Sequence, residues 1–179
     1  LGVNTELLVQ RKTGSSCHVR PPRTEWLRFL GLIYPWLDIL PKKLYRKGTS
    51  DFWSSGYLPN PSFPIGALRN ADLVHFHWVA EGFLPLLSVK KIKVPIVWTL
   101  HDMWAFTGGC HYSLECRRFE TECNNCPSLK NAGKTDMSNK IFRNKDFFDG
   151  INLTVATCSN WLKLEAEKSH LLRNKRIVN

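Results

Sequence analysis

The amino-acid sequence predicts an α/β protein: a Rossmann-like parallel sheet with flanking helices and a cysteine-rich loop inserted after its central strand. Short apolar runs rich in β-branched residues recur at residues 71–78, 95–100 and 151–157, and each is typical of a buried strand. Segments with helical spacing separate these runs, which is the strand–helix–strand order of a parallel sheet. The central run leads directly into His101 and Asp102, and ligands bind at the carboxyl ends of the strands in such sheets.

The N-terminal part is predicted to hold a strand at 7–9, a polar loop at 11–23 and a helical segment that begins at Thr24. Because an internal proline loses a hydrogen bond and clashes with the preceding turn, Pro35 and Pro41 predict two short helices in place of one long helix. The large side chains of the segment fall at helical spacing: Trp26, Phe29, Leu30, Ile33, Trp36, Leu37, Leu40 and Tyr45.

Two interpretations of this aromatic segment are open. Tryptophans followed by Lys42, Lys43, Arg46 and Lys47 are typical of a membrane-surface patch that lies against acidic lipids. Alternatively, the apolar stripe faces the core and the cations lie in the last helical turn, where the helix dipole favours them. We favour the core-facing interpretation, because most amphipathic helices pack against a core.

The remaining elements follow in order. Residues 51–70 are rich in Pro, Gly and Ser and predict an irregular connection, and a helix is expected over 83–91. His75 and His77 share one face of the strand at 71–78, but a metal pair there lacks a third ligand. Residues 136–148 have helical spacing, and Ser159 is placed to cap a helix over 161–172.

Length, composition and charge limit the possible functions. With 179 residues, 43% of them hydrophobic, the chain has the size of about one domain and can bury a core. The net charge of +10 favours anionic partners such as nucleic acid, nucleotide phosphates or an acidic membrane face. No apolar run reaches the roughly 18 residues that a membrane span requires. Both ends of the sequence are expected to be cut points in a longer chain.

Four of the six cysteines cluster after the central strand, within a loop over 102–135. The C-x2-C pair that ends the cluster is typical of half a tetrahedral thiolate site, so we predict a structural zinc ion bound by all four sulfurs. The first pair is spaced more widely than usual, and two disulfides or four free thiols are the alternatives. Such a dense cluster also favours a reducing, cytoplasmic compartment. The four predicted ligands are Cys110, Cys116, Cys123 and Cys126.

Four stretches of the sequence carry a family resemblance: V-H-F-H-W, I-V-W-T-L-H-D-M-W-A-F-T-G-G-C-H-Y-S, C-N-N-C-P, and T-C-S-N-W-L with a trailing S-x-L-L-x-N. They resemble bacterial family 4 glycosyltransferases of the GT-B fold, of the exopolysaccharide and lipopolysaccharide assembly type. The resemblance runs across residues 1–179 and is densest at 71–127.

The resemblance implies an enzyme larger than this chain. Such enzymes have two Rossmann-like domains that face a cleft, with the acceptor held mostly by the N-terminal domain and the nucleotide-sugar donor by the C-terminal domain. Residues 1–179 match the N-terminal, acceptor-side domain without its first strand and glycine-rich loop. The donor domain and its Glu-x7-Glu motif are absent, so we expect the fragment alone to be inactive. The full-length enzyme is expected to transfer a sugar, with retention, to a lipid-linked or polysaccharide acceptor, as a peripheral protein at the inner face of the cell membrane.

The resemblance also implies roles for single residues. His101 matches a histidine that faces the donor sugar and its phosphates, where an imidazole can donate to a sugar hydroxyl or a pyrophosphate oxygen. Asp102 is expected to orient His101, bind the acceptor or cap the following turn, and we favour a structural or orienting role. A plain turn would explain the presence of Gly108 and Gly109, and helix capping would explain Ser159, without any bound ligand. The candidate substrate-binding residues are His77, Trp104, Gly108, Gly109, Ser159 and Trp161.

Two other functions remain open. A zinc-knuckle domain that binds nucleic acid would account for the charge and the cysteines. The sequence has no aromatic–basic platform of recognised spacing, however, so nucleic acid is the disfavoured partner. An inactive structural remnant is expected if the natural chain ends near Asn179.

Overall fold

The centre of the protein is a four-stranded parallel sheet. The computed structural model describes residues 2–45, 53–56, 58, 60–63 and 65–179, without the side chains at 39, 42–45 and 69. The strands lie in the order β3-β4-β5-β6, and their bounds are Val74–Phe76, Ile96–Leu100, Leu153–Thr157 and Arg176–Val178. Neighbouring strands are parallel throughout, so each pair requires a crossover connection. This arrangement is consistent with the predicted Rossmann-like fold.

The two central strands bury the middle of the core. Along β4 and β5, buried and half-buried side chains alternate over five residues each. Trp98 of β4 lies beside Val155 of β5 in the register, and its ring packs edge-on against Phe76 and Phe148. The predicted strands at 95–100 and 151–157 are therefore confirmed, and the strand predicted at 71–78 is shorter in the structure.

The helices that connect the strands are short. They are α2 (Leu86–Val89), α3 (Met137–Arg143) and α4 (Asn160–Lys168), with 3-10 turns at Ile65–Asn70, Trp104–Phe106, Arg118–Glu120 and Asp146–Gly150. Asp136 caps α3 by accepting from the backbone N–H of Asn139 at 3.1 Å. Ser159 caps α4 by accepting from Leu162 N at 3.2 Å, so its predicted capping role is confirmed.

The prediction of two short helices near the N-terminus is wrong, because α1 runs without a break from Glu25 to Tyr45. Asp38 lies between the two prolines and supplies the physical reason. Its Oδ1 accepts from the backbone N–H of Gly56 at 2.8 Å and from Ser55 Oγ. These buried bonds anchor the middle of the helix to the interior, a tertiary contact that a rule based on the helix alone does not take into account.

The expectation that the aromatic stripe of α1 faces the core is also wrong. Trp26, Phe29 and Trp36 are exposed, whereas Gly31 and Asp38 on the opposite side of the helix are buried. Helical spacing shows that apolar residues share a face but does not show which face packs inward. The side chains of Lys42 and Lys43, and all of residues 46 and 47, lie outside the described residues.

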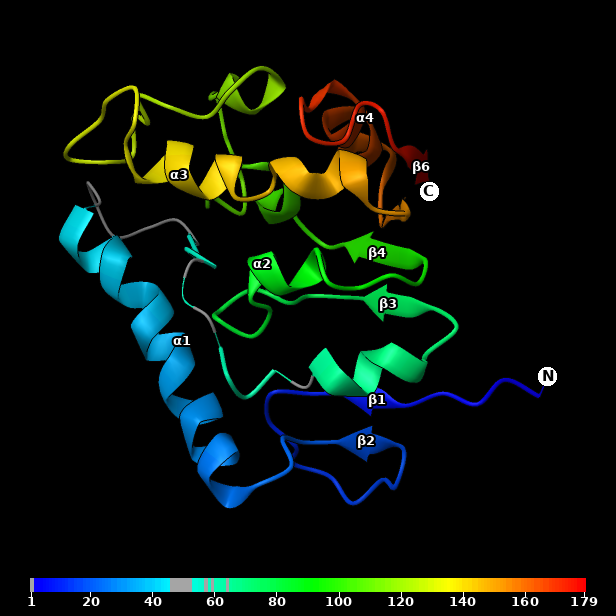
Figure 1. Ribbon diagram of the computed structural model, residues 1–179. Helices are drawn as coiled ribbons and strands as arrows, with labels where there is room; N and C mark the ends of the chain where they lie inside the picture. The colour runs from blue at the N-terminus through cyan, green and yellow to red at the C-terminus, as the bar shows by residue number, and fades with distance from the viewer. Residues whose placement is uncertain (1, 46–52, 57, 59, 64) are drawn as a thin grey trace.

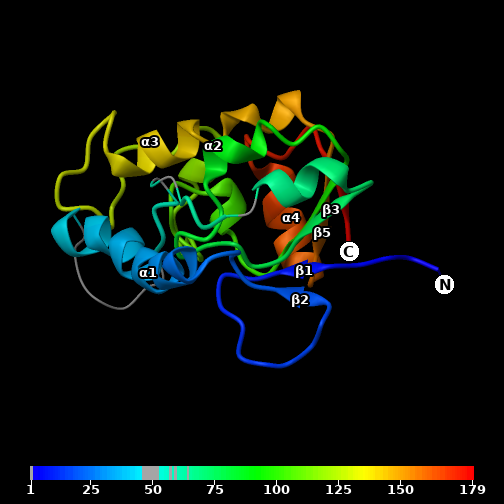
Figure 2. The same cartoon turned by 60° about the horizontal axis from the view of Figure 1, so that its bottom comes forward.

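The N-terminal residues form a separate strand pair, in which β1 (Leu7–Leu8) lies parallel to β2 (Val19–Arg20). The second strand falls inside the predicted loop at 11–23. Both views place this pair and α3 on opposite sides of the molecule (Figures 1 and 2). In Figure 1, α1 crosses the side of the molecule toward which the arrowheads of β3 and β4 point. The long helix therefore lies beyond the carboxyl ends of the sheet.

Candidate functional site

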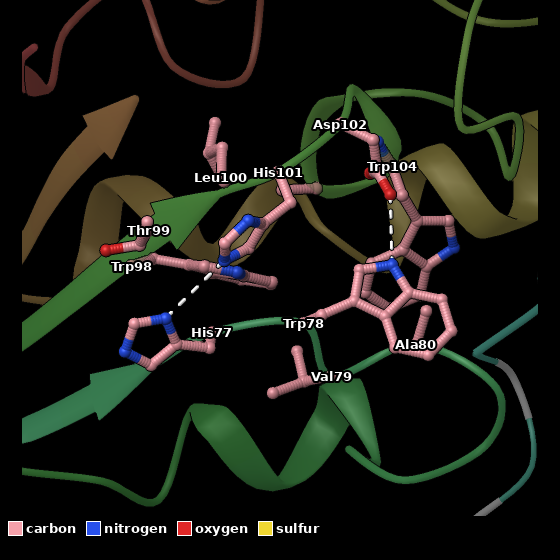
Figure 3. A pocket seen from close by; sticks show the side chains of 11 residues that line it. His77, Trp78, Val79, Ala80, Trp98, Thr99, Leu100, His101, Asp102 and Trp104 are labelled. Carbon is pink, nitrogen blue, oxygen red and sulfur yellow. Dashed lines mark hydrogen bonds between the residues drawn. The ribbon is translucent and has the colours of Figure 1, made fainter. Parts of the chain in front are cut away.

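A small hollow lies at the carboxyl ends of β3 and β4, as the sequence predicts for a parallel sheet. Residues 77–80, which follow β3, form one wall, and residues 99–102 form the other. The floor contains the buried rings of Trp98 and Trp104. Figure 3 shows His77 and His101 projecting from the two strand ends toward each other. The predicted residues His77, His101, Asp102 and Trp104 are thus brought together.

The two histidines form an exposed polar pair at the rim. Nδ1 of His77 and Nε2 of His101 are 3.5 Å apart, and the ring centroids are 5.8 Å apart. His75 lies on the same face of β3, where its Nε2 contacts Thr99 Oγ1 at 2.8 Å. Desolvation by burial and the nearby His77 together lower the pKa of His75. The rim therefore carries donors and acceptors that face solvent and are available to a ligand.

Asp102 points away from this rim and into a network of donors. Its Oδ2 accepts from Nδ1 of His111 at 2.7 Å and from the indole N–H of Trp78 at 3.0 Å, and its Oδ1 accepts from Trp104 N at 2.8 Å. Burial alone would raise the pKa of Asp102, but the hydrogen bonds and the charge interaction with His111 outweigh it and lower the pKa. Asp102 caps the turn after β4 and holds His111.

His111 is the residue of this site that sequence reasoning missed. It is buried, its Nε2 lies 3.1 Å from Ser54 Oγ, and its ring lies near those of Trp78 and Trp104. The indole N–H of Trp104 donates to the carbonyl of Ser54, which ties the same loop to the site. The signal in the sequence was the histidine that follows Gly-Gly-Cys, nine residues after the aspartate.

The structure packs Gly108 and Gly109 inside the protein, next to the cysteine loop. Gly109 has a φ of +118°, and a Cβ on it would lie 2.5 Å from the ring of Trp53. A Cβ on Gly108 would lie 2.6 Å from the carbonyl of Ser138. Close packing therefore requires both glycines. Their part in substrate binding stays a prediction.

Trp161 lies on a different part of the same edge of the sheet. It is the second residue of α4, which follows the carboxyl end of β5, and its exposed ring stacks on Tyr112 with centroids 6.3 Å apart. Tyr112 is the neighbour of His111 in sequence. The aromatic pair adds an exposed apolar surface to the edge, outside the hollow between β3 and β4.

All four clustered cysteines are free thiols in the structure, and Cys123 is buried. Burial raises the pKa of Cys110 to about 11, and burial together with the neighbouring Cys110 raises the pKa of Cys123 to about 12. Within the part of the chain that the structure describes, no group of three or more His, Cys, Asp and Glu side chains is arranged to hold a metal ion. The zinc site therefore stays a prediction.

Lys145 lies fully buried beside this cluster. Its Nζ donates to the carbonyl oxygens of Trp104 and Thr107, the latter at 2.9 Å, and lies 4.3 Å from the centroid of the Trp104 ring. Burial lowers the pKa of Lys145 to about 7, against the opposing influence of Cys123 and Cys110. Sequence reasoning missed this residue too, because it lies 38 positions or more from the carbonyls that it binds.

Comparison with known proteins adds one match. No protein-family model and no solved structure matches the chain. A protein of Escherichia coli (strain K12) described as "Putative colanic acid biosynthesis glycosyl transferase WcaC" is 40% identical over an alignment of 68 positions. The alignment covers 33% of this chain and 17% of that protein, so the chain spans a small part of the length of the relative that it matches. The similarity supports the general class of glycosyltransferase.

Proposed function

We propose that the chain is the acceptor-side part of a glycosyltransferase of the GT-B fold and family 4. The enzyme transfers a sugar, with retention, from a nucleotide-sugar to a lipid-linked or polysaccharide acceptor. The observation that carries the proposal is the pair His77 and His101, which projects from neighbouring parallel strands into the hollow at their carboxyl ends. The partial similarity to a glycosyltransferase supports it independently.

His101 is the catalytic residue of this proposal. In the reaction, the bond between the anomeric carbon and the donor's phosphate oxygen breaks, a bond to the acceptor oxygen forms, and the proton of the acceptor hydroxyl passes to the departing phosphate. Negative charge develops on the pyrophosphate as it leaves. An imidazole at the rim can donate a hydrogen bond to that oxygen or to a sugar hydroxyl, and His101 is exposed there with His77 at its side.

Asp102 acts as a positioning residue. Its hydrogen bonds go to His111, Trp78 and Trp104 N, so it fixes the turn that follows His101. His77 and Trp161 then present imidazole and indole surfaces along the carboxyl edge of the sheet, with the buried ring of Trp104 in the floor of the hollow. The capped start of α4 sets the place of Trp161. Gly108 and Gly109, which are buried, would serve the site indirectly by letting the turn pack closely against Ser138 and Trp53.

We retain the structural zinc site of Cys110, Cys116, Cys123 and Cys126 as part of the proposal. Four thiolates are the donor set of a closed structural site, and the C-x2-C pair has the usual spacing. In the described residues the thiols are not yet grouped around one point, so they would have to draw together to bind zinc. The cationic form of Lys145, which Cys123 and Cys110 favour, would offset the negative charge of such a centre.

The proposal is tested with the protein in its full natural length, incubated with a panel of labelled nucleotide-sugars and membrane extract as the source of acceptors. Transfer of label to glycolipid or polysaccharide is expected. Replacing His101 with Asn should lower the rate by about 10²- to 10⁴-fold, the usual contribution of a positioned acid–base group. His18→Asn is the matched control, because His18 is exposed and does not line the hollow.

Two results would overturn the proposal. One is the absence of transfer from every donor, together with salt-dependent retention on single-stranded DNA, which would favour the nucleic-acid alternative. The other is transfer that His101→Asn leaves unchanged, which would remove His101 from the site.

A further inference from the structure

Helix α1 turns a broad apolar face to the solvent. At 3.6 residues per turn, its six exposed large hydrophobic residues fall within an arc of roughly 140°. The two tryptophans on this arc are the most exposed, with 65% of the residue surface accessible at Trp26 and 71% at Trp36. The ring of Phe29 stacks on Trp26 at 5.8 Å. We call this surface the outer face of α1, and it consists of Trp26, Phe29, Leu32, Trp36, Leu37 and Leu40.

The inner side of the helix fixes this orientation. Gly31 lies so close to the N-terminal segment that a Cβ on it would be 3.2 Å from the carbonyl of Gln10. Gly82 lies equally close to the helix, since a Cβ on it would be 3.0 Å from the carbonyl oxygen of Tyr34. One turn further on, Asp38 binds Ser55 and Gly56 in the interior. Rotating the helix to bury its tryptophans would break these contacts, so the outer face is a stable feature of the fold.

The charge near the helix indicates what covers this face. Residues 1–45 contain seven Lys or Arg and three Asp or Glu. Of the acidic side chains, Asp38 is buried, Glu6 pairs with Arg20 and Glu25 pairs with Arg28. Arg11 and Arg23 are exposed in the segment that precedes the helix. A second copy of a chain with a net charge of +10 would be repelled, whereas an anionic surface would be attracted.

The pattern of the helix then selects a lipid surface. Tryptophan on a helix that is apolar on one side and flanked by basic residues is the composition of helices that lie in the bilayer interface. No helix in the described part of the chain is long and apolar enough to cross a membrane. We infer that the outer face of α1 binds the surface of an anionic lipid bilayer and lies on it without spanning it.

This placement connects the membrane with the candidate site. The inner side of α1 is linked to the site through Asp38, which binds Ser55, and through Ser54, which contacts His111. A bilayer on the outer face would lie on the side of the molecule toward which β3 and β4 point, with α1 between it and the candidate site, and a lipid-linked acceptor would have to pass the helix to reach His101. This last consequence rests on the proposed function, whereas binding to lipid does not.

The test uses the protein in its full natural length in vesicle flotation. One set of vesicles contains phosphatidylcholine alone, and the other contains phosphatidylcholine mixed with phosphatidylglycerol. The protein should float with the anionic vesicles, and added salt should weaken the binding. Trp36→Glu should reduce the bound fraction roughly tenfold or more, because it places a charge on the apolar face that would enter the lipid interface. Leu164→Glu is the matched control: Leu164 is 55% exposed on α4, far in sequence from α1, and its change should leave binding unaltered.

Several outcomes would overturn the inference. One is a folded protein that binds neither kind of vesicle, which would mean that another part of the full chain covers the face. A second is a dimer in light scattering that Trp36→Glu converts to a monomer, which would assign the face to a second copy. A third is binding that neither Trp36→Glu nor Leu40→Glu reduces. Vesicle binding requires no sugar transfer, so the two proposals can fail separately. The protein can transfer sugar without binding vesicles, and it can bind vesicles without transferring sugar.

Discussion

Lys145 should make the stability of the protein rise with pH just above neutrality. The amine is fully buried, and burial lowers its pKa from 10.5 to about 7. Between these values the unfolded chain keeps the proton that the folded chain has lost. Since stability rises with pH wherever the unfolded state binds more protons, the free energy of unfolding should increase by roughly 1.5 kcal/mol between pH 7 and 8.5, at about 1.4 kcal/mol per pH unit at most.

The assay is urea unfolding at several pH values in this window, with a chelator present so that no metal alters the neighbouring thiols. The window ends below the pKa range in which Cys110 and Cys123 act in the opposite direction, since their raised pKa values lower stability above about pH 9. Lys145→Met is the comparison. It leaves the carbonyls of Trp104 and Thr107 without the amine, so its stability should be lower overall, but the rise with pH should disappear.

Two results would refute the reasoning. The first is a wild-type free energy of unfolding that is flat or falls between pH 7 and 8.5. The second is the same slope in Lys145→Met, which would assign the titration to another group.

Three further predictions concern the turn after β4 and the loop that follows it. Gly109→Ala should lower the free energy of unfolding by about 3 kcal/mol, because of its positive φ and its contact with Trp53, whereas Gly133→Ala, which meets open space, should change it by less than about 1 kcal/mol in the same urea melts. Asp102→Asn should lower the free energy of unfolding by about 1–3 kcal/mol at neutral pH. Because the folded pKa of Asp102 is lowered, the stability that its carboxylate contributes is present above the ordinary pKa of 3.8 and is lost as pH falls through the folded pKa. The free energy of unfolding of the variant should therefore depend less on pH in the acid range than that of wild type. One zinc ion per chain should raise the melting temperature, a chelator should reverse the rise, and Cys123→Ser should abolish it; non-reducing mass spectrometry that finds two disulfides would contradict the zinc site.

The parts of the fold that were predictable from the sequence are those set by local patterns. The strands at 95–100 and 151–157 follow from short apolar runs, and the cap at Ser159 follows from a hydroxyl before a helix. The carboxyl-end location of His77 and His101 follows from the rule for parallel sheets, because both residues come directly after a strand in sequence.

The parts that were not predictable depend on contacts between distant residues. The hydrogen bond between His111 and Asp102 joins the two ends of a loop, and the hydrogen bonds of Lys145 join residues that are separated by two helical elements in the sequence. No local spacing in the sequence indicates either contact. The orientation of α1 was missed for a related reason. Its periodicity defines two faces, but the choice between them depends on Gly31 and Asp38, whose partners lie elsewhere in the chain.

The turn between residues 102 and 111 has a consequence for protein engineering. It is braced by the bond from Met103 N to the carbonyl of His111 at 2.9 Å, by the bond from Ser54 N to the carbonyl of Gly109 at 2.9 Å, and by Lys145 from below. A segment that is hydrogen-bonded at both ends and in the middle does not behave as a flexible lid, and an inserted residue would break some of these bonds. Libraries that vary the candidate site should therefore keep this segment constant and change the exposed positions around it, such as Tyr112 and Trp161.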